Sequence, residues 1–299
     1  PGKTTIRDYD FKKSKQLLEG TLSNAIVAPD GEMEIYDFPG DFLVNGEGRQ
    51  YARIRLEELQ SQHLRVQGGG TARGIACGHT FELTDHPRDD QNIKHLVLST
   101  HLQCRLSAHE AGGGGDTHVS CSFTAAPAST PFRPQRITPK TFVQGPQTAV
   151  VVGPAGEEIH CDEFGRVKVQ FFWDREGQKD DKSSCWIRVS HPWAGKGWGA
   201  ISIPRIGQEV IVDFIEGDPD HPIITGRVYN DDQTVPFSLP GQKVVSGIKS
   251  NTHKGSGYNE LSMDDTAGKE KINIHAQYDM ITVVEHDDTQ TVHNARVIK

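Results

Sequence analysis

Residues 147–230 contain five short segments with the apolar alternation of β-strands, and this pattern limits most strongly what the chain can fold into. In one of them, Val210, Val212 and Phe214 occupy every second position. A period of two places such side chains on one face of a strand. Because no long helical segment lies between the five, they predict a small antiparallel barrel, most often an OB-fold at this size. The segments are 164–173, 185–190, 199–203, 208–216 and 223–229.

Residues 1–135 have a mixed pattern that predicts one helix and two strands. Ala52, Leu56 and Leu59 recur at helical spacing, so a helix is expected over 48–61, and Gly68-Gly69-Gly70 is expected to end it. Strands are expected over 73–83 and 93–106, and the glycine-rich stretch 111–116 is expected to be a flexible loop. A proline-rich linker, 136–146, then leads to the barrel.

Residues 246–299 follow a second linker, 231–245, and have very little material for a core. Four short strands are expected over 260–263, 270–275, 279–285 and 291–298, and no Phe or Trp follows Phe237. A sheet this thin cannot offset its own ordering entropy as a monomer. We therefore expect this segment to be stable only when wound with other copies, as in a β-helix or β-prism.

Composition excludes several classes of protein. The 299 residues have a formal net charge of −8, so the chain has no overall attraction to nucleic acid or to anionic membranes. No apolar run is long enough to cross a bilayer. Five cysteines without a CxxC pair fit free thiols in a reducing compartment. The chain begins at Pro1 without a signal peptide, and we interpret it as an internal part of a longer protein.

Candidate metal ligands are present but lack the paired spacing of metal sites. Cys77 and His79 form one loose group, and His109, His118 and Cys121 form another. Structural zinc sites have tightly spaced ligand pairs, so buried thiols and loop histidines are the favoured interpretation.

Two further stretches carry residues that could hold a metal. The acidic stretch 174–181 departs from a calcium loop at Lys179 and Cys185, so a solvated hairpin loop is favoured. His275 could meet its own copies on a three-fold axis, but a polar strand residue facing solvent is the stronger interpretation. No cofactor is expected.

Catalytic motifs are absent from the sequence, and one binding function remains open. Ser190-His191 are adjacent, which on a strand points their side chains apart, and no GxSxG motif occurs. A nucleic-acid strand could lie on basic and aromatic residues of the barrel: Arg166, Lys168, Trp186, Arg188, Trp193 and Lys196. Packing of these aromatic residues between barrels or against a neighbouring subunit is the favoured alternative.

Long consecutive stretches of the barrel resemble the VgrG family of type VI secretion spike proteins. The matching stretches are 163–175, 184–190, 193–200, 204–210 and 214–230. The segments 37–40, 51–53 and 78–81 resemble the end of the family's phage-hub-like region, and 261–279 resembles the start of its β-helical needle. The resemblance therefore covers essentially the whole chain.

The resemblance implies a homotrimeric, non-catalytic protein. Its hub region would meet the Hcp tube, its OB barrels would form a neck, and three chains would intertwine in the needle. A PAAR tip protein and effectors would travel with the spike, which is assembled in the bacterial cytoplasm, contacts the target membrane mechanically and is secreted without a signal peptide. The phage counterpart carries a lysozyme domain between barrel and needle, and 231–245 is too short to hold one.

The remaining expectations concern residue roles and rival functions. Signature residues of the barrel are assigned to folding and inter-subunit packing: Gly165, Arg166, Trp173, Trp186, Trp193, Trp198, Pro204, Gly207, Gly217 and Asp218. The alternatives that stay open are a tail spike of a related phage-like contractile injection machine and an OB-type nucleic-acid-binding module.

Overall fold

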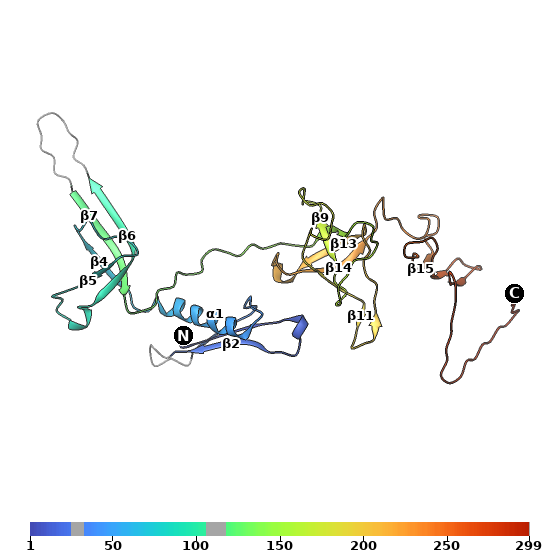
Figure 1. Ribbon diagram of the computed structural model, residues 1–299, viewed down its shortest axis with the longest axis horizontal. Coiled ribbons are helices and arrows are strands. Elements are labelled where there is room, and N and C mark those ends of the chain that lie inside the picture. The colour runs from blue at the N-terminus through green and yellow to red at the C-terminus, as the bar shows by residue number, and fades with distance from the viewer. Residues whose placement is uncertain (25–32, 106–117, 299) are drawn as a thin grey trace, which may run out of the picture. The chain divides into compact units, whose positions relative to one another are not determined.

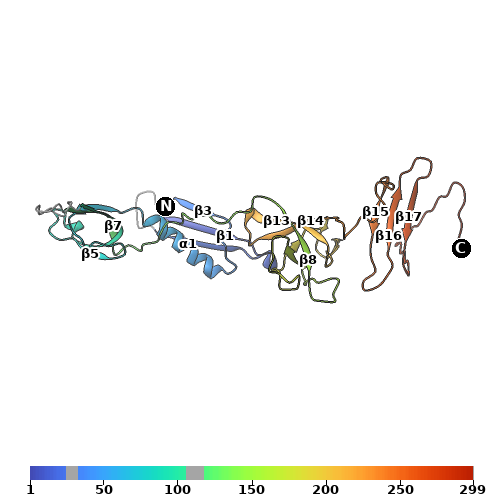
Figure 2. The same cartoon turned by 90° about the horizontal axis from the view of Figure 1, so that it is seen from above.

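The computed structural model describes residues 1–24, 33–105 and 118–298. The chain divides into two compact units, Pro1–Pro139 and Lys140–Lys299, which are treated separately below. Figures 1 and 2 show that strands dominate both units and that a long helix lies in the first. Within the described ranges, no helix has the length and apolar character needed to cross a membrane.

The first unit begins with a three-stranded sheet that packs against the helix. The strands β1 (Lys3–Asp8), β2 (Leu18–Ser23) and β3 (Glu34–Asp37) lie in the order β2-β1-β3, antiparallel on one side of β1 and parallel on the other. The helix α1 spans Asn45–Gln60, three residues earlier at its start than the sequence predicted. Its buried Ala52 joins Ile6, Leu18 and Phe42 in a small core. Short 3-10 turns lie at Phe11–Lys13 and Asp89–Gln91.

A four-stranded antiparallel sheet forms the other part of this unit. The strands β4 (Val66–Gly70), β5 (Thr80–Glu82), β6 (Lys94–Arg105) and β7 (His118–Pro127) have the order β4-β7-β6-β5. The prediction that 68–70 ends the helix is wrong, because these glycines form part of β4. A Cβ on Gly68 would lie 2.4 Å from the ring of Phe123, so the ring occupies the space of a side chain. The predicted strand 73–83 is reduced to β5, and the predicted loop 111–116 lies outside the described residues.

The second unit begins with the predicted barrel. Its five strands have the order β10-β14-β13-β8-β9, and the backbones of Val167 and Ile187 close the barrel through mutual N–H···O bonds of 3.0 and 2.8 Å. The strands are β8 (Gln147–Val152), β9 (Lys168–Phe171), β10 (Arg188–Val189), β13 (Glu209–Phe214) and β14 (Pro222–Val228). The buried core consists of Ala149, Val151, Val167, Val169, Ile187, Val210, Val212 and Ile224.

Three details of the barrel differ from the sequence-based expectation. The predicted strand 199–203 is not one of the five, because only Gly199–Ala200 form a strand and they pair with Trp193–Ala194 in a separate hairpin. The strand β8 was not predicted, because the run 147–152 has two polar residues followed by four consecutive apolar ones and shows no alternation. Gln170 is a polar residue of β9 and would ordinarily face solvent, yet only 6% of it is exposed. Its amide donates to the carbonyls of Asp174 and Gly177 and accepts from the amide of Lys179 at 2.7 Å. The loop therefore folds over Gln170 and buries it.

The chain leaves the barrel through a second antiparallel sheet, β15-β16-β17. Its strands are β15 (Val245–Lys249), β16 (Glu260–Asp264) and β17 (Lys271–His275). A small hairpin on the barrel joins β11 (Trp193–Ala194) to β12 (Gly199–Ala200), and a 3-10 turn lies at Ile215–Gly217. The predicted strands 279–285 and 291–298 do not form, since residues 276–298 of the single chain pair with no strand.

Candidate assembly site

The sheet β15-β16-β17 has two chemically different faces. Residues directly opposite one another on paired strands share a face, and Ile248, Leu261 and Ile274 form one such row. Met263 and Ile272 form the next apolar row on the same side. Exposure of these five side chains ranges from 42% for Met263 to 77% for Ile248. A sheet in water normally packs its apolar face against a core, and this face has no cover in the described single chain.

The opposite face is polar and internally bonded. Lys249, Glu260 and His275 form one row across the three strands. The imidazole Nδ1 of His275 donates to the carbonyl of Tyr258 at 3.0 Å, and the two rings stack at 4.4 Å. A hydrogen bond from Ser262 lowers the pKa of Glu260, with smaller help from Asn273 and Lys249. His275 thus lies on the face away from the apolar rows, as a polar strand residue.

Polar contacts join this sheet to the barrel. The guanidinium of Arg205 donates to the carbonyl of Asn251 at 2.8 Å and lies 3.5 Å from the carboxylate of Glu158. The backbone amide of Lys254 donates to the same carboxylate at 3.0 Å, and its ammonium group pairs with Glu157 at 3.2 Å. These contacts attach the connection between β15 and β16 to the barrel.

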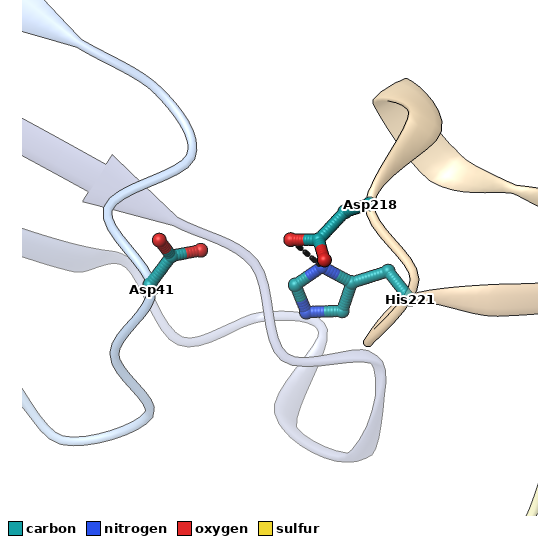
Figure 3. A group of neighbouring side chains, drawn as sticks. All are labelled: Asp41, Asp218 and His221. Atoms are coloured by element: carbon teal, nitrogen blue, oxygen red, sulfur yellow. Dashed lines mark ion pairs between the residues drawn. The ribbon is translucent and has the colours of Figure 1, made fainter. Parts of the chain in front are cut away.

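The signature residue Asp218 holds a corner of the barrel. Its side chain is 8% exposed and pairs with Lys140 and with Nδ1 of His221 at 3.2 Å, the pair drawn in Figure 3. Burial raises the pKa of this carboxyl, but the hydrogen bonds from Lys140 and from the amide of Asp220 outweigh it, so the pKa lies below its usual value. The corner therefore ties the linker to the turn 215–221.

Phe142 of the same linker packs on the turn at Gly217, where a Cβ would lie 2.2 Å from its ring. The amide of Val143 also donates to the carbonyl of Gly217 at 2.8 Å. Gly217 has a φ of 72°, which an L side chain rarely adopts. The glycine is therefore required both by the backbone conformation and by the aromatic ring above it.

Gly165 and Arg166 shape the turn that enters the strand β9. Gly165 has a φ of 69°, and Arg166 pairs with Asp162 at 2.6 Å, with both side chains largely buried. Burial raises the pKa of Asp162, but hydrogen bonds from the side chain and amide of Arg166 and from the amide of Phe164 bring it below its usual value. The ion pair and the glycine together close this turn.

The other signature residues occupy several places on the barrel. Trp186 is half-buried between His160, 4.9 Å away, and the ammonium of Lys168, 5.0 Å away. Pro204 is buried, and Gly207 turns at a φ of 91°. Trp173 is 70% exposed, although its indole N–H donates to Gln147 at 2.9 Å.

Trp193 and Trp198 lie on the hairpin β11–β12 and are 62% and 60% exposed. Their rings contact each other edge to face at 5.2 Å. The sequence predicted one binding surface that included Trp193, Lys168 and Trp186. In the structure Lys168 contacts Trp186 and the carbonyl of Asp181, whereas Trp193 contacts Trp198.

The candidate metal ligands are not brought together where the structure describes them. The thiol of Cys77 donates to the carbonyl of Leu98 at 2.9 Å, and Cys121 is buried within β7. His118 begins β7, and His109 lies outside the described residues. In the acidic loop, the carboxylate of Asp174 accepts from the amides of Glu176 and Gly177. Asp174 therefore organises its own loop.

The apolar rows of the C-terminal sheet were only partly visible in the sequence. The alternation of Ile272 and Ile274 was seen, but β15 was not predicted, so the contribution of Ile248 was missed. Arg205 and its partners were also missed, because Asn251 and Glu158 are far from it in sequence and carry no local signal.

Three family profiles match the chain in order. Residues 1–108 match the phage tail baseplate hub (GPD), and 148–229 match the type VI secretion system/phage-baseplate injector OB domain. Residues 246–299 match the bacteriophage T4 gp5 C-terminal trimerisation domain. The exposed apolar rows thus lie in the segment that matches a trimerisation domain.

Curated proteins match along almost the whole chain. The spike protein VgrG1a of Pseudomonas aeruginosa is 48% identical over 98% of this chain and 46% of its own length. VgrG3 of Vibrio cholerae is 41% identical over 97% of this chain and 29% of its own length. The actin cross-linking toxin VgrG1 of Vibrio cholerae is 41% identical over 97% of this chain, which is 27% of that protein. The chain therefore spans less than half the length of these relatives.

A solved structure of an Escherichia coli protein, described as a type VI secretion component similar to the T4 tail proteins gp27 and gp5, also matches. The two sequences are 20% identical, the match covers 75% of this chain and 56% of that protein's chain, and the TM-score is 0.44.

A hub segment, an OB barrel and a trimerisation segment in this order define a phage-tail-like spike protein. The sequence relatives narrow the class further. The chain belongs to the VgrG family of type VI secretion spike proteins.

Proposed function

We propose that this chain is a structural subunit of a homotrimeric type VI secretion spike. Three copies intertwine through residues 246–299, and the barrels form the neck above that segment. The observation that carries the proposal is the apolar face of β15-β16-β17, with Ile248, Ile272 and Ile274 each more than 60% exposed in the single chain. A face this apolar gains free energy when other copies bury it.

The mechanism we propose is mechanical rather than catalytic. The spike sits on the Hcp tube, carries a PAAR tip protein and effectors, and punctures the target membrane when the machine contracts. Relatives named as spike proteins support this role. The relative named as a toxin shares only 27% of its length with this chain, so its name assigns no activity to residues 1–299.

The polar face of the C-terminal sheet fits the outer surface of such a trimer. This face, bonded through Glu260 and His275, remains in water when the apolar face is covered. We infer that the assembled protein is exported from the cytoplasm as part of the machine, with no nucleic acid among its partners.

The molar mass in solution tests the trimer directly. Light scattering behind a sizing column, run over a range of concentrations, should give a mass near three times 33.0 kDa. A folded chain with the mass of one copy at every concentration contradicts the proposal.

Export tests the role of the trimer in the machine. In the bacterium that encodes the chain, loss of the protein should abolish release of the Hcp tube protein into the medium. The wild-type protein and a Lys271→Thr control should restore release, and Ile272→Thr should restore it poorly. Release that continues without the protein refutes the spike role even if the trimer forms.

A further inference from the structure

The hairpin β11–β12 presents two tryptophans at the surface of the barrel. Trp193 pairs with Ala200 across the hairpin, and the amide of Gly195 donates to the carbonyl of Trp198 at 2.8 Å. The two indoles meet edge to face at 5.2 Å, yet about three fifths of each is exposed. A fully buried tryptophan covers about 150–250 Å², so each indole leaves roughly 120 Å² free for a partner.

Glycines give this hairpin a shape that holds the indoles in place. A Cβ on Gly195 would lie 2.4 Å from the ring of Trp198, so that ring rests on bare backbone. Gly199 has a φ of 138°, and a Cβ there would lie 2.4 Å from the carbonyl of Trp193. The indole pair is therefore ordered before any partner arrives, which reduces the entropy lost on binding.

The base of the hairpin is bonded to the part of the chain that leads into the assembly segment. Arg227 donates to the hydroxyl of Ser202 at 3.0 Å, just after β12. Arg205 follows and donates to the carbonyl of Asn251, which lies in the segment matching a trimerisation domain. The indole pair is thus connected by a short, bonded stretch of chain to the place where copies meet.

Charge also favours a second copy as the partner. The tip between the two tryptophans carries Lys196 and no acidic residue, whereas the chain as a whole has a net charge of −8. The positive charge of Lys196 is therefore attracted by the net negative charge of a neighbouring copy.

We propose that the Trp193–Trp198 pair docks against the barrel of a second copy of this chain. This inference rests on the proposed trimer and adds the residues through which neighbouring barrels contact one another. In the assembled protein both indoles are shielded from solvent, and the barrels are fixed to one another as well as through the C-terminal segment.

Fluorine NMR of the protein labelled with 5-fluorotryptophan tests the shielding. The chain has four tryptophans, so single Trp→Phe variants assign every resonance. Trp186, which is half-buried between His160 and Lys168 of its own barrel, gives an internal comparison. A soluble paramagnetic relaxation agent should broaden the resonances of Trp193 and Trp198 much less in the trimer than in an Ile272→Thr/Ile274→Thr variant shown to be monomeric.

Assembly measurements provide a second, independent readout. The Trp193→Ala/Trp198→Ala variant should need a protein concentration about tenfold higher or more to form the trimer, because buried tryptophans are often dominant contacts. Tyr229→Ala is the matched control, because Tyr229 is an aromatic residue of the barrel that is 63% exposed and has no assigned role in packing between copies, and it should assemble as the wild type does. Far-UV circular dichroism confirms that both variants remain folded.

The failures of the two proposals are distinguishable. If the wild type has the mass of three copies but its hairpin indoles remain as accessible as in the monomeric variant, the docking proposal is wrong and the trimer stands. Unchanged assembly of the double alanine variant leads to the same conclusion. If the wild type has the mass of one copy at every concentration, both proposals are wrong.

Discussion

Replacing Ile272 by threonine should weaken assembly without affecting the fold of the single chain. Ile272 is 70% exposed in the single chain, so little of its side chain contributes to the chain's own stability. Threonine keeps the β-branch that suits a strand but carries a hydroxyl in place of an ethyl group. The loss therefore falls on the interface between copies.

The magnitude follows from the exposed fraction. Burying an isoleucine side chain completely is worth about 2 kcal/mol, so burying 70% of one is worth about 1.4 kcal/mol. Threonine loses about all of this, because the cost of burying its hydroxyl offsets what its remaining methyl group gains. Three copies lose about 4 kcal/mol per trimer, which is about 10³ in the three-chain association constant. The protein concentration at which half of the chains are assembled varies as the square root of the three-chain dissociation constant, the inverse of that association constant. We therefore expect this midpoint concentration to rise roughly 30-fold.

Light scattering or sedimentation over a concentration series measures the midpoint directly. Lys271→Thr is the matched control, because Lys271 is the preceding residue of the same strand and lies on the opposite face. The Lys271→Thr variant gains the same threonine side chain on the other face and should leave the midpoint concentration of assembly unchanged. Equal midpoints for the two variants would refute the argument that the Ile272 face meets other copies.

Three further variants test local features of the fold. Asp218→Asn should lower the free energy of unfolding by about 1–2 kcal/mol in chemical denaturation at pH 7. Because folding lowers the pKa of this carboxyl, the difference between the two proteins should vanish as pH falls through the folded-state pKa. A difference that persists at strongly acidic pH would contradict the assignment. Gly68→Ala should destabilise the first unit by about 1–3 kcal/mol, and adding Phe123→Leu should relieve part of that loss. Gln170→Leu should speed amide exchange across the loop 174–183, and unchanged exchange would show that Gln170 does not hold it.

Local patterns predicted much of the secondary structure but not its pairing. The alternation of Val210 and Val212 indicated β13, and both side chains are fully buried. The helical spacing of Ala52 and Leu56 indicated α1 and its buried face. These predictions succeed because the periodicity of a strand or helix is a property of neighbouring residues in the sequence.

Errors arose where a distant residue decided the outcome. The glycines 68–70 look like a helix terminator, but they pair with residues 121–123 of β7 as a strand, and the ring of Phe123 covers Gly68. Gln170 looks like a solvent-facing residue, but a loop that follows it folds back and buries its amide. Neither partner can be identified from the local sequence.

The candidate assembly site divides in the same way. Sequence alone indicated that residues 246–299 have too few large apolar residues for a core of their own, and the resemblance supplied the class of protein. Only the register of β15, β16 and β17 placed Ile248, Leu261 and Ile274 in one exposed row, with His275 on the opposite face. A shift of one residue in that register would exchange the two faces, so hydrogen bonding between strands, rather than composition, determined which side chains await a partner.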